Sequence, residues 1–326
     1  MNYYLGIDAG GTKTLVVIAD ESGRVHGVGR SGSGNWESVG LDGAYAAYEA
    51  GLAEALQAAG IQREQLRAAG YALAGIDWPS DYARLTPVID RLRVAGPYAL
   101  ENDTMAALRA GSSNGSGVVV IAGTGSTVAG RNQHGERFRT FGLGRLWGDF
   151  QGASGLVWEA LRVLALRHYG RITTTSLEAR LLDACGASSV VELAERISRD
   201  ELPLPHGELA PLVFAEAEAG DEMAQQIIRE AGAEMGANAA AMVRRLAMQR
   251  DRFELVMAGG VFNSGNALLV EALVTPVQAI APQARPVVLQ VPPAIGSVLL
   301  AFDAADVPVD EQVRARLAAD VQPWVA

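Results

Sequence analysis

LGIDAGGTKT, the stretch at residues 5–14, decides the fold of the first part of the chain. An apolar run ends in one carboxylate, Asp8, and a glycine turn follows it. Residues 15–19, LVVIA, are then apolar and mostly β-branched. This pattern predicts a strand, a polar turn and a second strand.

The glycine turn has the composition of a phosphate-binding loop. Glycine lets the backbone approach a bound oxyanion, and successive backbone N–H groups of a turn can surround a phosphate group. The lysine adds positive charge, and the two threonines add hydroxyl donors. The candidate phosphate-binding residues are Gly10, Gly11, Thr12, Lys13 and Thr14. Asp8 can hold a hydrated magnesium ion, because Mg²⁺ binds through carboxylates while keeping several waters.

Two known phosphate motifs do not fit these residues. Gly6 and Gly11 have the spacing of a Walker loop, but the sequence TKT follows instead of Lys-Ser/Thr, and the next segment is β-branched rather than helical. The dinucleotide-binding fingerprint also requires a helix at this point. An ordinary Gly-Gly hairpin turn without a ligand remains an alternative, since such dipeptides commonly mark hairpins.

Composition indicates a globular protein with two domains. A chain of 326 residues, 49% of them hydrophobic, can fill two cores. The formal charge of −10 argues against a nucleic-acid or anionic-membrane partner. The single cysteine, Cys185, cannot form an internal disulfide, and we expect a buried structural thiol. The first predicted strand starts at Tyr3 and no stretch suits a membrane span, so we expect a cytoplasmic protein.

The first third of the chain predicts a mixed sheet covered by helices. The predicted strands cover residues 3–8, 14–20, 24–30, 69–74 and 97–101, and the predicted helices cover residues 41–59, 80–93 and 104–110. Three hairpin-linked strands followed by strand–helix crossovers give such a sheet.

A linker-like stretch, GSSNGSG at residues 111–117, predicts a domain boundary. We therefore expect one domain over residues 1–112 and a second over residues 113–308, with a helix at about 309–326 packing back on the first. The strand predicted at residues 118–122 runs into GTGST and continues at residues 128–130, which repeats the opening hairpin.

The second half is predicted to be mostly helical. The predicted helices cover residues 150–167, 176–184, 190–198 and 221–245. A strand at residues 253–257 then leads into Gly259 and Gly260, and residues 292–297 open a last helix that runs through Phe302.

Two phosphate-type hairpins and a late strand entering a Gly-Gly pair, in this order, resemble the sugar kinase, actin and heat-shock ATPase superfamily. Within it, the chain resembles the N-acetylglucosamine kinase and archaeal-type hexokinase group of the BadF/BadG/BcrA/BcrD ATPase family, from Gly6 to about Ala301. The resemblance implies an α/β fold of two ribonuclease-H-like, actin-like ATPase domains, each a mixed sheet flanked by helices. It also implies ATP and Mg²⁺ in an interdomain cleft, and a homodimer.

The resemblance assigns the site residues. It places the first phosphate motif at residues 8–14, with Asp8 near Mg²⁺, and the second at Gly123, Thr124 and Gly125. The adenosine motif falls on Gly259 and Gly260. The sugar-contacting positions fall on Asn35, Asp103, Ser126, Thr127, Gly144 and Asp149.

One departure from the family pattern concerns the sugar. The family usually has GWG followed by GDEGS, whereas this chain has GLG at residues 142–144 and GDFQGAS at residues 148–154. The tryptophan that walls the sugar pocket is therefore missing, and Trp147 or Trp36 can take its place. This departure leaves the identity of the sugar open.

Asp103 is the predicted general base, because it follows a buried strand at the edge where ligands bind in α/β domains. The structural alternative is that Asn102 or Asp103 caps the helix at residues 104–110. Asp149 has the same two interpretations, since it can orient sugar hydroxyls or cap the following helix. Asn35 can likewise contact the sugar or form a turn.

The predicted function is ATP-dependent phosphorylation of the 6-hydroxyl of a hexose or amino sugar. One alternative is an ATPase activator of a 2-hydroxyacyl-CoA dehydratase type system, which holds an iron–sulfur cluster with two cysteines from each subunit; the sole Cys185 is too few. The other is a non-catalytic, sugar-responsive protein that keeps the actin-like fold.

Overall fold

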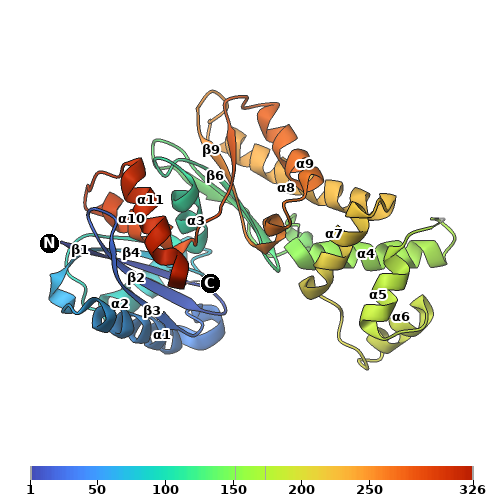
Figure 1. The fold of residues 1–326 in the computed structure, drawn as a ribbon, viewed down its shortest axis with the longest axis horizontal. Coiled ribbons are helices and arrows are strands. Elements are labelled where there is room, and N and C mark those ends of the chain that lie inside the picture. Colours follow the sequence, from blue (N-terminus) through green and yellow to red (C-terminus); the bar gives the residue numbers. More distant parts are fainter. Residues whose placement is uncertain (1, 151, 173, 325–326) are drawn as a thin grey trace. The chain divides into compact units, whose positions relative to one another are not determined.

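Two five-stranded sheets organise the chain in the computed structural model, which describes residues 2–150, 152–172 and 174–324 (Figure 1). The chain divides into two units. Unit 1 holds the residues up to Val119 and from Leu289 onward, and unit 2 holds Val120–Val288. Each sheet has helices packed against it, so the expected fold class, α/β with mixed sheets flanked by helices, is confirmed.

The sheet of unit 1 has the strand order β3-β2-β1-β4-β5. Its strands are β1 Tyr3–Ala9, β2 Thr14–Asp20, β3 Val25–Ser31, β4 Leu66–Leu73 and β5 Tyr98–Asn102. The first three strands are antiparallel neighbours, whereas β1, β4 and β5 run parallel. The carboxyl ends of these three parallel strands therefore lie at one edge of the sheet.

Alternation along β1 divides the core of unit 1 into two layers. Leu5, Ile7 and Ala9 face helices α1 Trp36–Ala59 and α2 Pro79–Asp90. Tyr4, on the other face, packs with helices α10 Ala294–Ala304 and α11 Glu311–Val321. Successive strand residues point to opposite faces, so Asp8 belongs to the α10 face.

Helix α10 packs on β1 without an intervening side chain. A methyl group at Gly6 would lie 2.6 Å from the Val298 nitrogen, so only glycine fits there. Tyr4 meets Phe302 farther along, with ring centroids 4.9 Å apart. Tyr4 thus lies beside the C-terminal part of α10, and Gly6, two residues later, lies beside Val298, nearer the start of that helix. The first turn of α10 therefore lies toward the end of β1 that carries Asp8.

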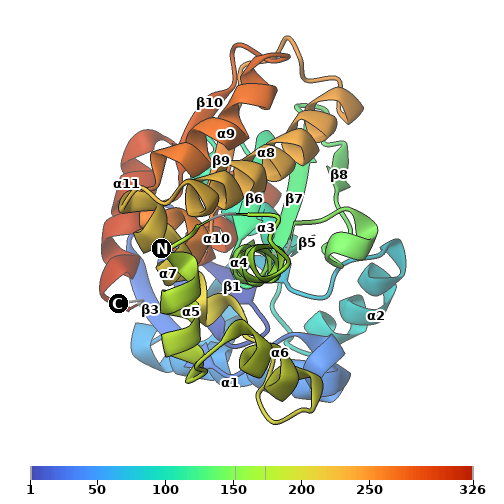
Figure 2. The same ribbon diagram turned by 90° about the vertical axis from the view of Figure 1, so that its right-hand side faces the viewer.

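The sheet of unit 2 has the order β10-β9-β6-β7-β8. Its strands are β6 Gly117–Ala122, β7 Ser126–Arg131, β8 Arg137–Arg139, β9 Glu254–Ala258 and β10 Arg285–Val288. The long helix α8 Glu222–Arg245 packs along α9 Ala267–Gln278 and against β7, as Figures 1 and 2 show. The remaining helices are α4 Gly152–His168, α5 Leu177–Cys185, α6 Val190–Ser198 and α7 Ala210–Glu218.

Three features differ from the sequence expectations. Helix α1 begins at Trp36 rather than Leu41, because Asn35 caps a first turn that precedes a kink at Gly40. The second unit ends at Val288 rather than residue 308, because α10 packs on β1 and β4 of the first sheet. Helices α7 and α9 and strands β8 and β10 were not predicted.

No helix among the described residues is long and apolar enough to cross a membrane.

Candidate active site

The first hairpin of unit 1 forms as predicted, with Ala9 paired to Thr14 across the turn. The Gly10 N–H donates to the Lys13 carbonyl at 2.9 Å, which closes the turn and leaves Gly11, Thr12 and Lys13 exposed. The Thr14 hydroxyl instead donates to the Gly32 carbonyl at 3.0 Å, and Thr14 is buried. Of the five candidate phosphate-binding residues, Gly11, Thr12 and Lys13 thus face solvent, whereas the Thr14 hydroxyl is used in a hydrogen bond within unit 1.

Two carboxylates lie at the carboxyl edge of the unit 1 sheet. Asp8 is in register with Ala72 of β4 and, through it, with Glu101 of β5. Asp103 is the first residue of helix α3 Asp103–Gly111, directly after β5. Burial and the nearby negative charge of Asp103 raise the pKa of Asp8 to about 7, while Lys13 acts to lower it. Asp8 and Asp103 are therefore electrostatic neighbours.

Helix α3 is capped by Asn102. Its Oδ1 atom accepts from the Thr104 N–H at 3.1 Å and from the Thr104 hydroxyl at 2.6 Å, while Nδ2 donates to the Ile76 carbonyl at 3.1 Å. An Asn at this position satisfies one of the N–H groups that a helix start leaves unpaired. The capping alternative is thus realised by Asn102, and capping does not account for Asp103.

Asn35 lies in a loop that is tied to the same edge. The Gly34 N–H donates to the Gly10 carbonyl at 3.2 Å, and the Ala74 N–H donates to the Ala9 carbonyl at 2.8 Å. Asn35 Oδ1 caps α1 by accepting from the Glu37 N–H at 3.0 Å. Unit 1 therefore brings Asn35, Asp8, Asp103 and the first turn to one edge of its sheet.

The Trp36 side chain is held in place by contacts within unit 1. Its Nε1 atom donates to the Gly75 carbonyl at 2.7 Å, and the Arg84 guanidinium lies over its ring. A side chain held on both sides cannot turn toward a ligand without losing these contacts. Of the two tryptophans that could wall a sugar, Trp147 of unit 2 is the exposed one, at 57%.

The second hairpin holds the start of α4. The N–H groups of Ala153 and Ser154 donate to the carbonyls of Gly123 and Thr124, at 2.8 and 3.1 Å. The Ser126 hydroxyl donates to the Phe150 carbonyl. Thr124 and Gly125 themselves are exposed at the turn. The turn carbonyls are therefore used within unit 2, whereas the tip of the turn faces solvent.

Asp149 is buried inside the turn at residues 142–149. One of its carboxylate oxygens accepts from the Leu143 N–H at 3.0 Å, and its own N–H donates to the Gly144 carbonyl at 3.2 Å. Thr127 borders this turn, because a methyl group at Gly142 would lie 2.8 Å from the Thr127 hydroxyl oxygen. Asp149 does not cap α4, since the first N–H groups of that helix bond to the second hairpin.

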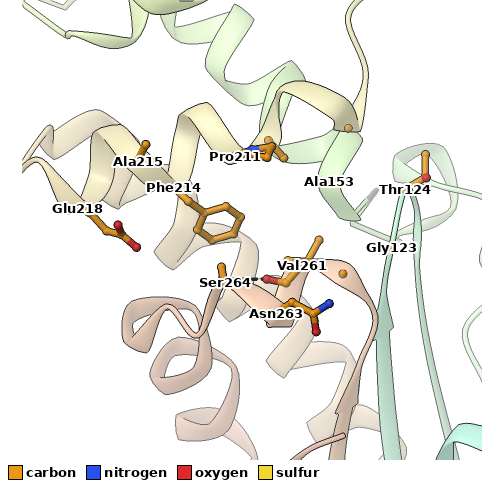
Figure 3. Close-up of a pocket in the computed structure, with 13 residues that line it drawn as sticks. Gly123, Thr124, Ala153, Pro211, Phe214, Ala215, Glu218, Val261, Asn263 and Ser264 are labelled. Carbon is orange, nitrogen blue, oxygen red and sulfur yellow. Dashed lines mark hydrogen bonds between the residues drawn. The ribbon is translucent and has the colours of Figure 1, made fainter. Parts of the chain in front are cut away.

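A pocket of about 620 Å³ opens beside the second hairpin (Figure 3). Its walls come from the second hairpin, the start of α4, helix α7 and a 3₁₀ turn at Gly260–Ser264. Phe214 and Pro211 of α7 face Val261 and Asn263 of that turn across the pocket. This size and a mainly apolar lining suit a small organic ligand such as a nucleoside.

Gly259 connects the end of β9 to the 3₁₀ turn that forms one wall of this pocket. Its φ is +102°, and a methyl group there would lie 2.4 Å from the Ala122 carbonyl oxygen. Only glycine combines that backbone conformation with such an approach. Gly259 thus sets the turn that presents Gly260 to the pocket, in the unit that also holds the second hairpin.

Sequence reasoning missed the α7 side of the pocket. Phe214, Pro211 and Glu218 line it, yet no helix was predicted over residues 210–218. Pro211 in the first turn and apolar residues at positions 213, 214 and 217 are a usable helix signal. Asn263 was also missed, because the sequence motif covered only the Gly-Gly pair before it.

The residues described in the structure contain no cluster of three or more His, Cys, Asp and Glu side chains suited to a metal ion. Asp8 nevertheless fits a divalent cation, because burial and the nearby charge of Asp103 raise its pKa, and a positive charge beside this carboxylate stabilises its ionised form. Mg²⁺ commonly binds through one or two carboxylates, with substrate phosphates and water completing its shell.

A family model matches nearly the whole chain. The model of the BadF/BadG/BcrA/BcrD ATPase family covers residues 5–301. An N-acetylmuramic acid/N-acetylglucosamine kinase from Clostridium acetobutylicum is 29% identical over 272 residues, which cover 83% of this chain and 89% of that protein. An N-acetyl-D-glucosamine kinase from Dictyostelium discoideum is 26% identical over 313 residues, which cover 92% and 98% of the two chains.

A solved structure shares the fold. It is that of a Chromobacterium violaceum protein provisionally named an N-acetylglucosamine kinase, with a TM-score of 0.67 and 23% identity. The match covers 92% of this chain and 99% of that chain.

Proposed function

Because the chain belongs to the BadF/BadG/BcrA/BcrD ATPase family, we propose that it is an ATP-dependent kinase for the 6-hydroxyl of an amino sugar of the N-acetylglucosamine type. The observation that carries the proposal is the carboxylate pair Asp8 and Asp103 beside the exposed, lysine-bearing turn of unit 1. Phosphoryl transfer needs charge neutralisation, positioning and a group that accepts the hydroxyl proton. The edge of unit 1 supplies a candidate for each.

Asp103 acts as the general base. It lies at the first position of α3, and Asn102 already caps the helix, so the Asp103 carboxylate is not used as the cap. Its carboxylate accepts the proton of the 6-hydroxyl as that oxygen bonds to the γ-phosphorus; the bond from the γ-phosphorus to the bridging oxygen breaks, and ADP leaves with that electron pair. Such assistance typically contributes about 10²–10⁴-fold to the rate.

Asp8 would hold Mg²⁺ through water, and Lys13 with the N–H groups of Gly11 and Thr12 would contact the phosphate oxygens. When bound, Mg²⁺ neutralises charge on the phosphates. The raised pKa of Asp8, about 7, means that positive charge beside this carboxylate is needed to keep it ionised near neutral pH. Lys13 already acts to lower this pKa, and a bound Mg²⁺ would supply further positive charge.

Unit 2 binds the nucleotide. The pocket between α7 and the Gly260–Ser264 turn takes the adenosine, and the N–H groups at the tip of the second hairpin, Thr124 and Gly125, contact phosphate. Apolar side chains such as Phe214 and Val261 cover the base.

Each unit, taken by itself, has polar groups that suit sugar hydroxyls. Asn35 Oδ1 is used for capping, so its Nδ2 group donates to a sugar hydroxyl. In unit 2 the turn around Gly144 and Asp149, with Ser126 and Thr127 of β7, contacts the sugar, and the exposed Trp147 provides an apolar wall. The homodimer and the cytoplasmic location stay predictions from the sequence.

The direct test measures ADP release with glucose, mannose, glucosamine, N-acetylglucosamine and N-acetylmuramate as acceptors. We expect sugar-stimulated, Mg²⁺-dependent ADP release with at least one amino sugar and loss of turnover with excess EDTA. Phosphorus–proton coupling in the product then locates the phosphate at C6. If none of the five sugars stimulates ADP release, the kinase proposal is wrong.

A further inference from the structure

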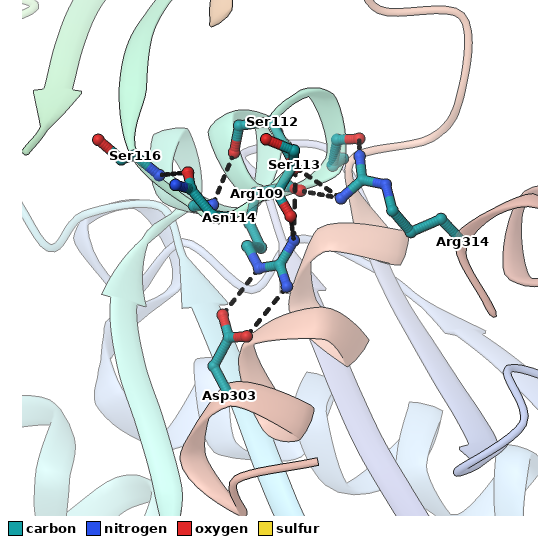
Figure 4. Close-up of polar contacts among 9 residues, drawn as sticks. Arg109, Ser112, Ser113, Asn114, Ser116, Asp303 and Arg314 are labelled. Carbon is teal, nitrogen blue, oxygen red and sulfur yellow. Dashed lines mark hydrogen bonds and ion pairs between the residues drawn. The ribbon is translucent and has the colours of Figure 1, made fainter. Parts of the chain in front are cut away.

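The C-terminal end of α3 is held by an arginine from the C-terminal helix. Arg314 of α11 donates through Nη1 to the Ser112 carbonyl at 2.5 Å and through Nη2 to the Ala110 carbonyl at 2.7 Å (Figure 4). Its Nη1 atom also lies 3.3 Å from the Arg109 carbonyl oxygen. The last carbonyls of a helix have no partner within the helix, and a cation there also complements the helix dipole.

A second arginine ties the same helix end to α10. Arg109 is only 3% exposed, and its Nε and Nη2 atoms donate to the two oxygens of Asp303 at 2.8 and 3.0 Å. This two-point geometry fixes direction as well as distance. Because Asp303 lies on α10, the end of α3 is fixed against both C-terminal helices, as Figure 4 shows for Arg109, Asp303 and Arg314.

Helix α3 can transmit a shift from this end to the other. It has nine residues, seven of which are buried, and spans roughly 13 Å at 1.5 Å per residue. A short helix inside a close-packed core moves as one body, since its neighbours leave little room for it to bend. Asp103 is its first residue, so the position of Asp103 depends on how the far end is held.

We propose that Arg314 is a positioning residue for phosphoryl transfer: by holding the C-terminal carbonyls of α3, it fixes the place of Asp103 at the other end of that helix. The inference rests on the proposed kinase function, and it assigns a role in the reaction to the C-terminal helix α11. Small misplacements of a reacting group reduce the rate strongly, whereas the pocket that we propose for the nucleotide lies in unit 2 and has no lining residue from α3.

The test compares Arg314→Ala and Arg314→Lys with Arg316→Ala. Arg316 is a matched control, because it lies on the same helix, is exposed and donates to the Ser22 hydroxyl rather than to α3. In Arg314→Ala we expect kcat to fall about tenfold to a hundredfold, with the KM for ATP within about twofold of wild type. The loss of kcat should be smaller in Arg314→Lys, since the lysine ammonium keeps the positive charge but lacks the planar guanidinium that donates to two carbonyls. Added guanidinium should restore part of the kcat of Arg314→Ala, because the Arg314 position is partly exposed.

A folded Arg314→Ala with wild-type kcat would overturn the inference, as would an equal loss in Arg316→Ala. If Arg314→Ala does not fold, Arg314→Lys takes its place, and a wild-type kcat in that variant has the same meaning. Amide hydrogen exchange at Thr104 and Met105 supplies a readout that needs no turnover: exchange should accelerate in the Arg314 variants, and unchanged exchange contradicts the inference. Failure of the proposed function is separate, because it shows in the wild-type protein as absent sugar-stimulated ADP release.

Discussion

The two glycine hairpins have similar sequences but different surroundings. AGGTKT of unit 1 and AGTGST of unit 2 both join two strands with an exposed tip. The first carries a lysine and lies beside Asp8 and Asp103. The second has no charged side chain, and its carbonyls hold the start of α4 beside an apolar pocket.

This difference shows that the neighbours of a hairpin, more than its own sequence, decide what it can do. The carboxylates and the lysine suit the first hairpin to phosphate, metal and proton chemistry. The apolar wall of α7 beside the second hairpin suits the adenosine of a nucleotide whose phosphates the uncharged hairpin tip contacts. Changes in unit 1 should therefore alter catalysis and pH dependence, whereas changes in unit 2 should alter nucleotide affinity.

The largest expected effect in this comparison is on kcat. Asp103→Asn keeps the size of the side chain but removes the proposed proton acceptor, so kcat should fall about 10²–10⁴-fold. The affinity for ADP, measured by calorimetry, should stay within about twofold, because the pocket that we propose for adenosine lies in unit 2. Asp42→Asn is the control, since this carboxylate of unit 1 is 92% exposed. A variant with near-normal kcat would remove Asp103 from the role of base.

The next effect concerns the pH dependence of stability. The pKa of Asp8 rises from 3.8 to about 7 on folding, so the folded state holds a proton that the unfolded state releases. The contribution of Asp8 to the free energy of unfolding is therefore fully present below pH 4 and is lost as the pH rises through 7. Asp8→Asn in EDTA should raise the free energy of unfolding at pH 8 by at most about 4 kcal/mol, with a much smaller gain at pH 5. Urea unfolding at both pH values checks this, and an equal gain at the two values speaks against a raised pKa.

Much of unit 1 could be predicted from the sequence because its patterns are local. Apolar runs on both sides of the Gly-Gly turn predicted β1 and β2, and the glycine after residue 59 marked the end of α1. The start of α1 was missed, because Gly40 interrupts the helical pattern after a first turn that depends on the Asn35 cap.

The sites were harder to predict, since they depend on contacts between distant segments. The sequence offered Asn102 and Asp103 equally as a cap, and only the Thr104 contact distinguishes them. The end of unit 2 was misplaced because nothing near residue 288 reveals that α10 packs on β1. The α7 wall of the pocket was missed for the same reason: its apolar residues matter only where α7 meets the turn after β9.

A smaller effect is expected from the turn that enters the unit 2 pocket. Gly259→Ala places a methyl group against the Ala122 carbonyl at a φ of +102°, so the free energy of unfolding should fall by about 3 kcal/mol. The Kd for ADP should rise about tenfold, because the strand end carries the pocket wall. Gly260→Ala is the matched control for stability alone, since no atom lies within 4 Å of its added methyl group, although Gly260 itself lines the pocket. Similar losses of stability in both variants would show that the close approach at Gly259 is not what matters.

The smallest effect is expected at the apolar wall itself, where Phe214 lies 8% exposed on α7. Phe214→Leu keeps an apolar side chain of similar bulk but removes the aromatic face, so the Kd for ADP should rise about fivefold, or roughly 1 kcal/mol. The rate constant kcat at saturating ATP should not change, because the carboxylates of unit 1 are untouched. Phe138→Leu is the control, as this ring of β8 is 41% exposed and lies outside the pocket. A loss of kcat at saturating ATP in Phe214→Leu would contradict the assignment of catalysis to unit 1 and of nucleotide affinity to unit 2.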